Sequence, residues 1–206
     1  MEHDKIICLD IETVPDRALI PEWSEGKFPP KPIWHQIVAI SFVEAQINYD
    51  NGLPEKYAVT CCRSSGDSEW DEQRLLSKFW QYFAECAPRV VTWNGKGFDL
   101  PVLRARAMMY GISAQSWYQR GTKWDSYMQR FAPDWHCDLM EQLSDYRACA
   151  SMKLVDVAFA LGLRVRSAAT DQRSRRWSGA ARSTTFALIA RATASTFSFC
   201  TCGGHS

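Results

Sequence analysis

The residues Ile6-Ile7-Cys8-Leu9-Asp10-Ile11-Glu12 form a short apolar run that ends in two acids. Such a run predicts a buried central strand. Because alternate side chains of a strand point to the same face, Asp10 and Glu12 should lie next to each other at the end of this strand. Two neighbouring carboxylates are costly to bury unless a cation neutralises them, and hard oxygen ligands favour Mg²⁺ or Mn²⁺ over zinc. Taken alone, the pair is explained better as a solvated strand end.

A second stretch changes that balance. Asn94-Gly95-Lys96-Gly97-Phe98-Asp99 follows a predicted strand over 89–93 and opens a predicted helix that Gly111 ends. Its two glycines allow a sharp turn, which would present Asp99 at the tip of a strand next to the first one. A third carboxylate can then join Asp10 and Glu12. The alternative is an ordinary glycine-rich turn whose Asp caps the helix; neither the Walker nor the dinucleotide-binding pattern fits.

The remaining hydrophobic pattern predicts the rest of an α/β fold. Segments 36–42 and 56–62 are apolar and β-branched, and the turn signal between them makes three consecutive antiparallel strands. Helical spacing follows over 71–86, and the region 112–135 predicts a long irregular connection. Two further helices are predicted over 138–146 and 151–161. This order is typical of a ribonuclease H-like mixed sheet flanked by helices, here over residues 1–163.

Composition excludes several classes of protein. A chain of 206 residues with 46% hydrophobic and 13% aromatic residues can bury a core and is not a disordered protein. It has no long uncharged apolar stretch and no signal-peptide pattern, so we expect a cytoplasmic protein without a membrane span. The eight cysteines contain no C-x-x-C pair and are best explained as buried or free thiols. The histidines lack the spacing of a ligand cluster: His3, His35, His136 and His205.

Together the two motifs resemble the DEDD superfamily of 3′–5′ exonucleases. Asp10-Ile11-Glu12 is similar to its first motif, and Asn94 through Phe98-Asp99 is similar to the N-x-x-x-F-D second motif of family B DNA polymerase proofreading domains. The strongest resemblance is to bacterial stand-alone proteins described as predicted exonucleases of that polymerase-B-like type. It extends from about Lys5 to Leu163 and includes the segment Cys137-Asp138-Leu139-Met140.

The resemblance implies a mechanism. Asp10, Glu12 and Asp99 would be the catalytic residues and would hold two Mg²⁺ or Mn²⁺ ions, while Asn94 and Phe98 would contact the terminal nucleotide. The expected partner is nucleic acid with a single-stranded 3′ end, DNA being favoured over RNA. Of the nearby residues, Lys96 is explained better as an exposed loop lysine and Asp138 as a helix cap.

The third motif of the superfamily, a Tyr followed four residues later by a metal-binding Asp, is missing after Ser151. Residues 164–206 form instead a basic tail rich in Ala, Ser, Thr and Arg, without clear periodicity. Such composition is typical of a GC-rich gene read in the wrong frame. In the alternative frame, the codons for Leu188 to Thr193 can encode Tyr-Cys-Glu-Gly-Asp, which has the missing Tyr and Asp at the required spacing. We therefore predict a frameshift near Leu163, so that the last helix is missing or replaced by an irregular tail.

Three functions compete at this point. The first is a two-metal-ion 3′–5′ exonuclease that is impaired in this chain by loss of the third motif. The second is a catalytically inactive nucleic-acid-binding module on the same fold, which would bind without magnesium. The third, a metabolic enzyme on an α/β fold, would need a nucleotide or cofactor loop that the sequence does not contain.

Overall fold

The computed structural model describes residues 3–22, 24, 27–50, 53–66 and 71–162. The chain forms two compact units, Met1–Asp138 and Leu139–Ser206. The predicted tail at 164–206 and the predicted frameshift near Leu163 lie outside the described residues. Every predicted site residue belongs to the first unit.

A five-stranded sheet organises the first unit. Its strands follow the order β3-β2-β1-β4-β5. The antiparallel pairs are β1–β2 and β2–β3, and the parallel pairs are β1–β4 and β4–β5. The predicted mixed sheet is therefore confirmed. The strand bounds are Lys5–Pro15 for β1, His35–Asp50 for β2, Leu53–Ser65 for β3, Arg89–Thr92 for β4 and His136–Asp138 for β5.

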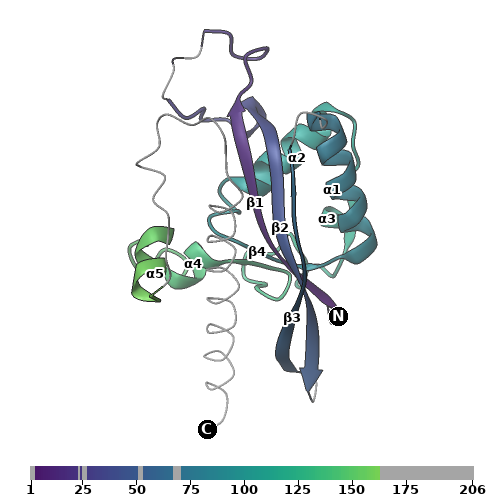
Figure 1. Cartoon of the computed structure of the whole chain (residues 1–206), viewed down its shortest axis with the longest axis vertical. Helices are drawn as coiled ribbons and strands as arrows, with labels where there is room; N and C mark the ends of the chain where they lie inside the picture. The colour runs from purple at the N-terminus through teal and green to yellow at the C-terminus, as the bar shows by residue number, and fades with distance from the viewer. Residues whose placement is uncertain (1–2, 23, 25–26, 51–52, 67–70, 163–206) are drawn as a thin grey trace. The chain divides into compact units, whose positions relative to one another are not determined.

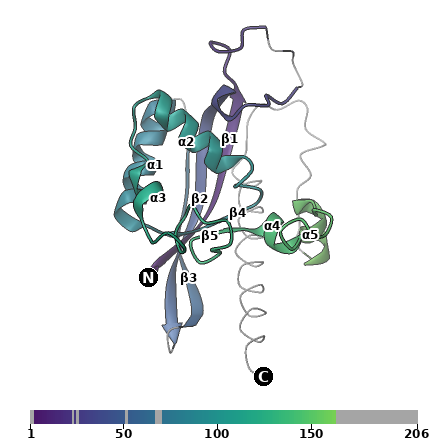
Figure 2. The same cartoon turned by 180° about the vertical axis from the view of Figure 1, so that it is seen from behind.

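Within the first unit, the helices α1 (Glu72–Cys86), α2 (Asp99–Met109) and α3 (Gln115–Gln119) lie on one side of this sheet, as both views show (Figures 1 and 2). Ile7, Leu9 and Ile11 of β1 point to this side and join a core with apolar residues of the helices. By strand alternation, Asp10 and Glu12 point to the opposite face. None of the described helices is long and apolar enough to cross a membrane. In the first unit these elements are the 3₁₀ helix η1 at Pro32–Trp34, α1 at Glu72–Cys86, α2 at Asp99–Met109 and α3 at Gln115–Gln119; the second unit contains α4 at Leu139–Leu143 and α5 at Leu154–Ala160.

The helix α1 forms where its sequence predicts. Asp71 precedes its first turn, and the Asp71 side chain accepts a hydrogen bond from the backbone N–H of Arg74 at 2.7 Å. This is the usual N-cap, which satisfies one of the free N–H groups at a helix start. The apolar residues that predicted the helix are all buried: Leu75, Leu76, Phe79, Trp80 and Phe83.

Two local predictions were wrong. The connection over 112–135 contains the helix α3, whose Trp117 is only 3% exposed because it packs into the core. The predicted helix over 138–146 begins instead with the strand β5, which pairs with β4 as far as Asp138, and the helix α4 follows. A strand of three residues is too short to produce a recognisable period, and its pairing with β4 decides its conformation.

A buried ionic network connects α1 and α2 to the loop after β1 and to the first residues of β2. The Arg106 guanidinium of α2, 1% exposed, donates to both carboxylate oxygens of Glu72, at 2.8 Å from Nε. It also donates to Asp16 at 2.7 Å and to the carbonyl oxygen of Ile33 at 3.0 Å. Glu72 in turn accepts the backbone N–H of Ile37 at 2.7 Å. One cation therefore holds together α1, α2 and the loop that follows β1.

We predict that Arg106→Ala lowers the free energy of unfolding by about 3–5 kcal/mol, because it leaves two buried carboxylates without their cation. Chemical denaturation monitored by tryptophan fluorescence measures the loss. Lys78→Ala, at an exposed position of α1, is the control and should change stability by less than about 0.5 kcal/mol. A loss below about 1 kcal/mol for the Arg106 variant would contradict the assignment.

Candidate active site

The end of β1 and the start of α2 meet through one hydrogen bond. The pairing of β1 with β4 ends at Cys8 and Val91, so the following residues of β1 have no strand partner on that side. There the backbone N–H of Ile11 donates to Oδ1 of Asp99 at 3.1 Å. The Asp99 carboxylate thus takes the place of a strand partner and lies beside the D-x-E segment. The prediction that Asp99 follows a strand adjacent to the first is confirmed.

Asp10 is close enough to Asp99 to influence the ionisation of Asp99. Burial raises the pKa of Asp10 to about 6. Burial, and after it the negative charge of Asp10, raises the pKa of Asp99 to about 8, and the charge of Asp138 contributes in the same direction. In the described part of the chain neither Asp10 nor Asp99 forms an ion pair. A half-buried acid beside a buried one, neither of them in an ion pair, is the chemistry that a divalent cation would neutralise.

Glu12 follows Asp10 by two residues on β1. It is half-buried, and its Cα pairs with Ala39 next to a β-bulge that leaves Val38 of β2 without an opposite residue. Within residues 3–22, 24, 27–50, 53–66 and 71–162, no three His, Cys, Asp or Glu side chains form a group arranged to hold a metal ion. The structure therefore brings together Asp10 and Asp99, while the metal-binding roles of all three acids, Glu12 included, stay a prediction.

The loop of the second motif is shaped by its backbone. Asn94 has a φ of 60°, a conformation that Asn tolerates better than most residues. Its carbonyl oxygen accepts the N–H groups of Gly97 and Phe98, both at 3.0 Å. A Cβ at Gly95 would lie 2.3 Å from Oγ1 of the buried Thr92, so no larger residue fits there. The tight turn delivers Asp99 to the first position of α2.

Asp138 holds this loop from the neighbouring strand. Its Oδ1 accepts the backbone N–H of Asn94 and its Oδ2 that of Lys96, each at 2.9 Å. Asp138 is 1% exposed. Asp138 ends β5 beside β4 and directly precedes the first residue of α4, and its carboxylate faces the Asn94–Asp99 loop. Its expected role as a helix cap stays a prediction. The sequence signal was present in Cys137-Asp138-Leu139-Met140, but only the strand pairing reveals the role.

Phe98 belongs to a small aromatic group beside the loop. Its ring centroid lies 5.0 Å from that of His35 and 5.1 Å from that of Phe28. His35 is buried and bonds to the carbonyl oxygen of Pro29 at 2.8 Å and to Oγ1 of Thr13 at 3.1 Å. The substrate contacts predicted for Asn94 and Phe98 stay predictions.

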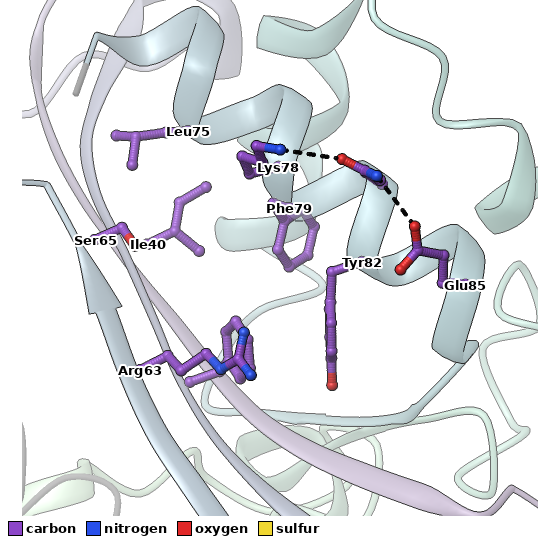
Figure 3. A pocket seen from close by; sticks show the side chains of 10 residues that line it. Ile40, Arg63, Ser65, Leu75, Lys78, Phe79, Tyr82 and Glu85 are labelled. Carbon is purple, nitrogen blue, oxygen red and sulfur yellow. Dashed lines mark hydrogen bonds between the residues drawn. The ribbon is translucent and has the colours of Figure 1, made fainter.

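A separate pocket lies between α1 and the strands β2 and β3 (Figure 3). Phe42, Arg63, Lys78 and Tyr82 are among its lining residues, and none of the predicted site residues is. The Phe42 and Tyr82 rings stack with centroids 5.0 Å apart. Lys78 and Glu85 both bond to Gln81 on α1, so their charged ends are engaged along the helix. The pocket is thus distinct from the acidic site.

Fold and site together define a ribonuclease H-like domain with carboxylates at the end of its central strand. A family model described as a predicted 3′–5′ exonuclease related to the exonuclease domain of PolB matches residues 27–166. The chain belongs to this family, and the predicted resemblance is confirmed. The matched range includes Asn94, Phe98 and Asp99 and begins after Glu12.

Solved structures support the same fold. The chain is similar to a family B DNA polymerase from the archaeon Pyrobaculum calidifontis, with a TM-score of 0.54, 18% identity and coverage of 91% of this chain and 23% of that one. It is also similar to E. coli exonuclease I in complex with a dT13 oligonucleotide, with a TM-score of 0.52, 11% identity and coverage of 93% and 41%. The chain thus spans less than half the length of these proteins. It has no significant match among curated protein sequences.

We predict that Asp99→Asn stabilises the metal-free protein at alkaline pH. Wild-type Asp99 ionises at a pKa near 3.8 when unfolded but near 8 when folded, so its contribution to stability falls as the pH rises through that window. The neutral amide escapes this loss and keeps an oxygen for the Ile11 N–H. Thermal denaturation in EDTA should show the variant gaining at least about 1 kcal/mol, or about 2–4 °C, over wild type between pH 4 and pH 8. A pH-independent difference would contradict the prediction.

For Asp138→Asn we expect a loss of about 1–3 kcal/mol, because the amide cannot accept both N–H groups and places its own NH₂ against one of them. Amide hydrogen exchange of Asn94 and Lys96 should accelerate in this variant. Asp125→Asn, at an exposed position, is the matched control. Unchanged protection of both amides would show that Asp138 does not hold the loop.

Proposed function

We propose that the protein is a two-metal-ion 3′–5′ exonuclease of the cytoplasm that hydrolyses phosphodiesters from a single-stranded 3′ end. The observation that carries this proposal is the Ile11 N–H bond that holds Asp99 beside Asp10, in a chain whose family is described as predicted 3′–5′ exonucleases. Buried acids that repel each other destabilise the empty site, which favours a ligand of opposite charge.

The donor chemistry fits Mg²⁺ or Mn²⁺. Asp10 and Asp99 offer half-buried and buried carboxylate oxygens, respectively, and Glu12 follows on the same face of β1 as Asp10. When bound, two such ions would lower the pKa of the attacking water and stabilise the leaving 3′ oxygen. The protein's own contribution is positional: the Ile11 N–H fixes the Asp99 carboxylate, and Asp138 fixes the loop that carries it.

The substrate end would meet the Asn94–Asp99 loop. Asn94 is half-buried there, and Phe98 lies in the aromatic group with His35 and Phe28. An amide can contact the strand, and a ring can pack against the terminal base. E. coli exonuclease I, which is similar in fold, is described in complex with a dT13 oligonucleotide and in a complex with single-stranded DNA. We therefore propose DNA in preference to RNA.

The chain lacks the Tyr and Asp of the third motif, so we propose that its hydrolysis is weak. A two-metal site without its fourth carboxylate binds the second ion less tightly, and the attacking water loses the Tyr that orients it. The frameshift near Leu163 would account for this loss. On that hypothesis the basic tail of 164–206 has no selected function.

The same missing motif favours one alternative, a nucleic-acid-binding module that keeps the fold without hydrolysis. This module would bind a single strand in the absence of magnesium. Its binding would survive Asp10→Ala and Asp99→Ala, whereas binding through metal ions would not.

A degradation assay tests the proposal. A single-stranded DNA with a labelled 3′ end is incubated with Mg²⁺ and either this chain or a version with the reading frame restored after Leu163. We expect the restored version to be at least about 100-fold faster, because removal of groups that support a metal centre typically costs 10–100-fold or more. EDTA and Asp99→Asn in the restored version should each abolish the activity.

Equal rates for the two versions would show that the third motif is dispensable, against the proposal of impairment. A restored version that degrades DNA equally well with Asp99→Asn would overturn the assignment of the site. Sequencing of the encoding nucleotides gives an independent check, since codons for Leu188 to Thr193 that cannot spell Tyr-Cys-Glu-x-Asp would exclude the frameshift.

A further inference from the structure

The connection between α2 and β5 carries exposed aromatic rings. The exposed fractions are 52% for Tyr118, 78% for Trp124 and 68% for Phe131. Isolated exposed apolar side chains are normal on protein surfaces. Three large rings within 14 consecutive residues, next to a candidate active site, are a different case.

Each of these rings has a cation beside it. The Arg104 guanidinium lies 5.9 Å from the centre of Tyr118. Lys123 Nζ lies 4.7 Å from the Trp124 ring. The Arg130 guanidinium lies 5.7 Å from the Phe131 ring. We name these three pairs the aromatic–basic surface.

This surface is joined to the loop of the second motif. Lys96, two residues after Asn94, donates from Nζ to the carbonyl oxygen of Arg130 at 2.6 Å. Lys96 and Arg104 also act on one buried ring: burial first, and then the positive charges of these two residues, lower the pKa of His136 to about 3. The contact between Lys96 and Arg130 therefore joins the aromatic–basic surface to the loop that leads to Asp99.

The charge of this region is positive although residues 1–163 as a whole are net acidic. The segment 112–131 contains three cations, Arg120, Lys123 and Arg130, and one acid, Asp125. Lys96 and Arg104 add to this from neighbouring elements. Local positive charge of this kind attracts a polyanion to one face of an otherwise acidic protein.

We infer that the aromatic–basic surface binds the unpaired stretch of a DNA strand whose 3′ end lies in the acidic site. This inference rests on the proposed function and names where the rest of the substrate runs. Each nucleotide of a single strand has one phosphate and one base. Each pair on the surface offers a cation that can bind a phosphate and a ring that can stack on a base. Bases of a duplex are already stacked on one another, so the surface selects single strands.

A binding assay in a hydrolysis-deficient background tests this inference. The full chain carrying Asp99→Asn is titrated against a fluorescein-labelled dT oligonucleotide, and anisotropy gives the Kd. We expect Trp124→Ala with Phe131→Ala to weaken binding at least about 10-fold, since each lost base–ring stack is worth several-fold or more in affinity. Met108→Ala and Val59→Ala, which alter exposed apolar side chains on α2 and β3, are the matched controls and should leave Kd unchanged.

The cations have a separate readout. Lys123→Gln with Arg130→Gln should reduce the slope of log K against log salt concentration by about 1.4, because each phosphate contact to a single strand contributes about 0.7. The ring variant should leave this slope unchanged. Circular dichroism and the melting temperature of each variant exclude unfolding as the cause.

Two results would overturn the inference: a ring variant that binds dT like the controls, or an equal loss of affinity for blunt duplex DNA. The proposed function fails separately. If no version of the chain hydrolyses DNA and dT binding still depends on Trp124 and Phe131, the surface stands and the nuclease does not. If the frame-restored protein degrades DNA while the ring variant binds normally, the nuclease stands and the surface does not.

Discussion

The hydrogen bond from the Ile11 N–H to the Asp99 carboxylate is the constraint on which the site depends. The strand β1 extends beyond the end of its pairing with β4. Without Asp99, the backbone N–H of Ile11 would therefore be a buried donor with no acceptor. Asp99 satisfies that donor, and in doing so it comes within electrostatic range of Asp10. One hydrogen bond thus both satisfies the buried N–H of Ile11 and places the Asp99 carboxylate near Asp10.

Polar contacts elsewhere in the first unit stabilise the structure around these two acids. Two buried acids near each other disfavour the folded state when both are ionised. The network around Arg106 fixes the helices and the loop after β1, and Asp138 fixes the Asn94–Asp99 loop by two N–H groups. Neither of these groups is part of the D-x-E or N-x-x-x-F-D patterns. They act as the rigid support that an electrostatically strained site requires.

The site and the aromatic–basic surface share one structural element. The Asn94–Asp99 loop carries Asp99 at its end and Lys96 at its middle, and Lys96 contacts the segment that bears Arg130 and Phe131. An enzyme that works from the end of a polymer has to hold the strand behind the reacting bond as well as the bond itself. The link between the proposed metal-binding acids and the proposed nucleotide-binding pairs, through Lys96, fits this demand.

The sequence by itself determined the architecture and most of the site. Hydrophobic period predicted β1 to β4, α1 and α2 because these elements are long or strongly patterned, and the order of the two motifs predicted that Asp99 would meet the end of β1. Only the tertiary structure decided the rest. The strand β5 is three residues long, so its pairing with β4 decides its conformation and places the Asp138 carboxylate against the Asn94–Asp99 loop. Trp117 of α3 is buried against residues far away in the chain, and Arg106 bonds to a residue 90 positions away. Long-range contacts of this kind produce no hydrophobic periodicity in the local sequence. They could therefore not be predicted from neighbouring residues.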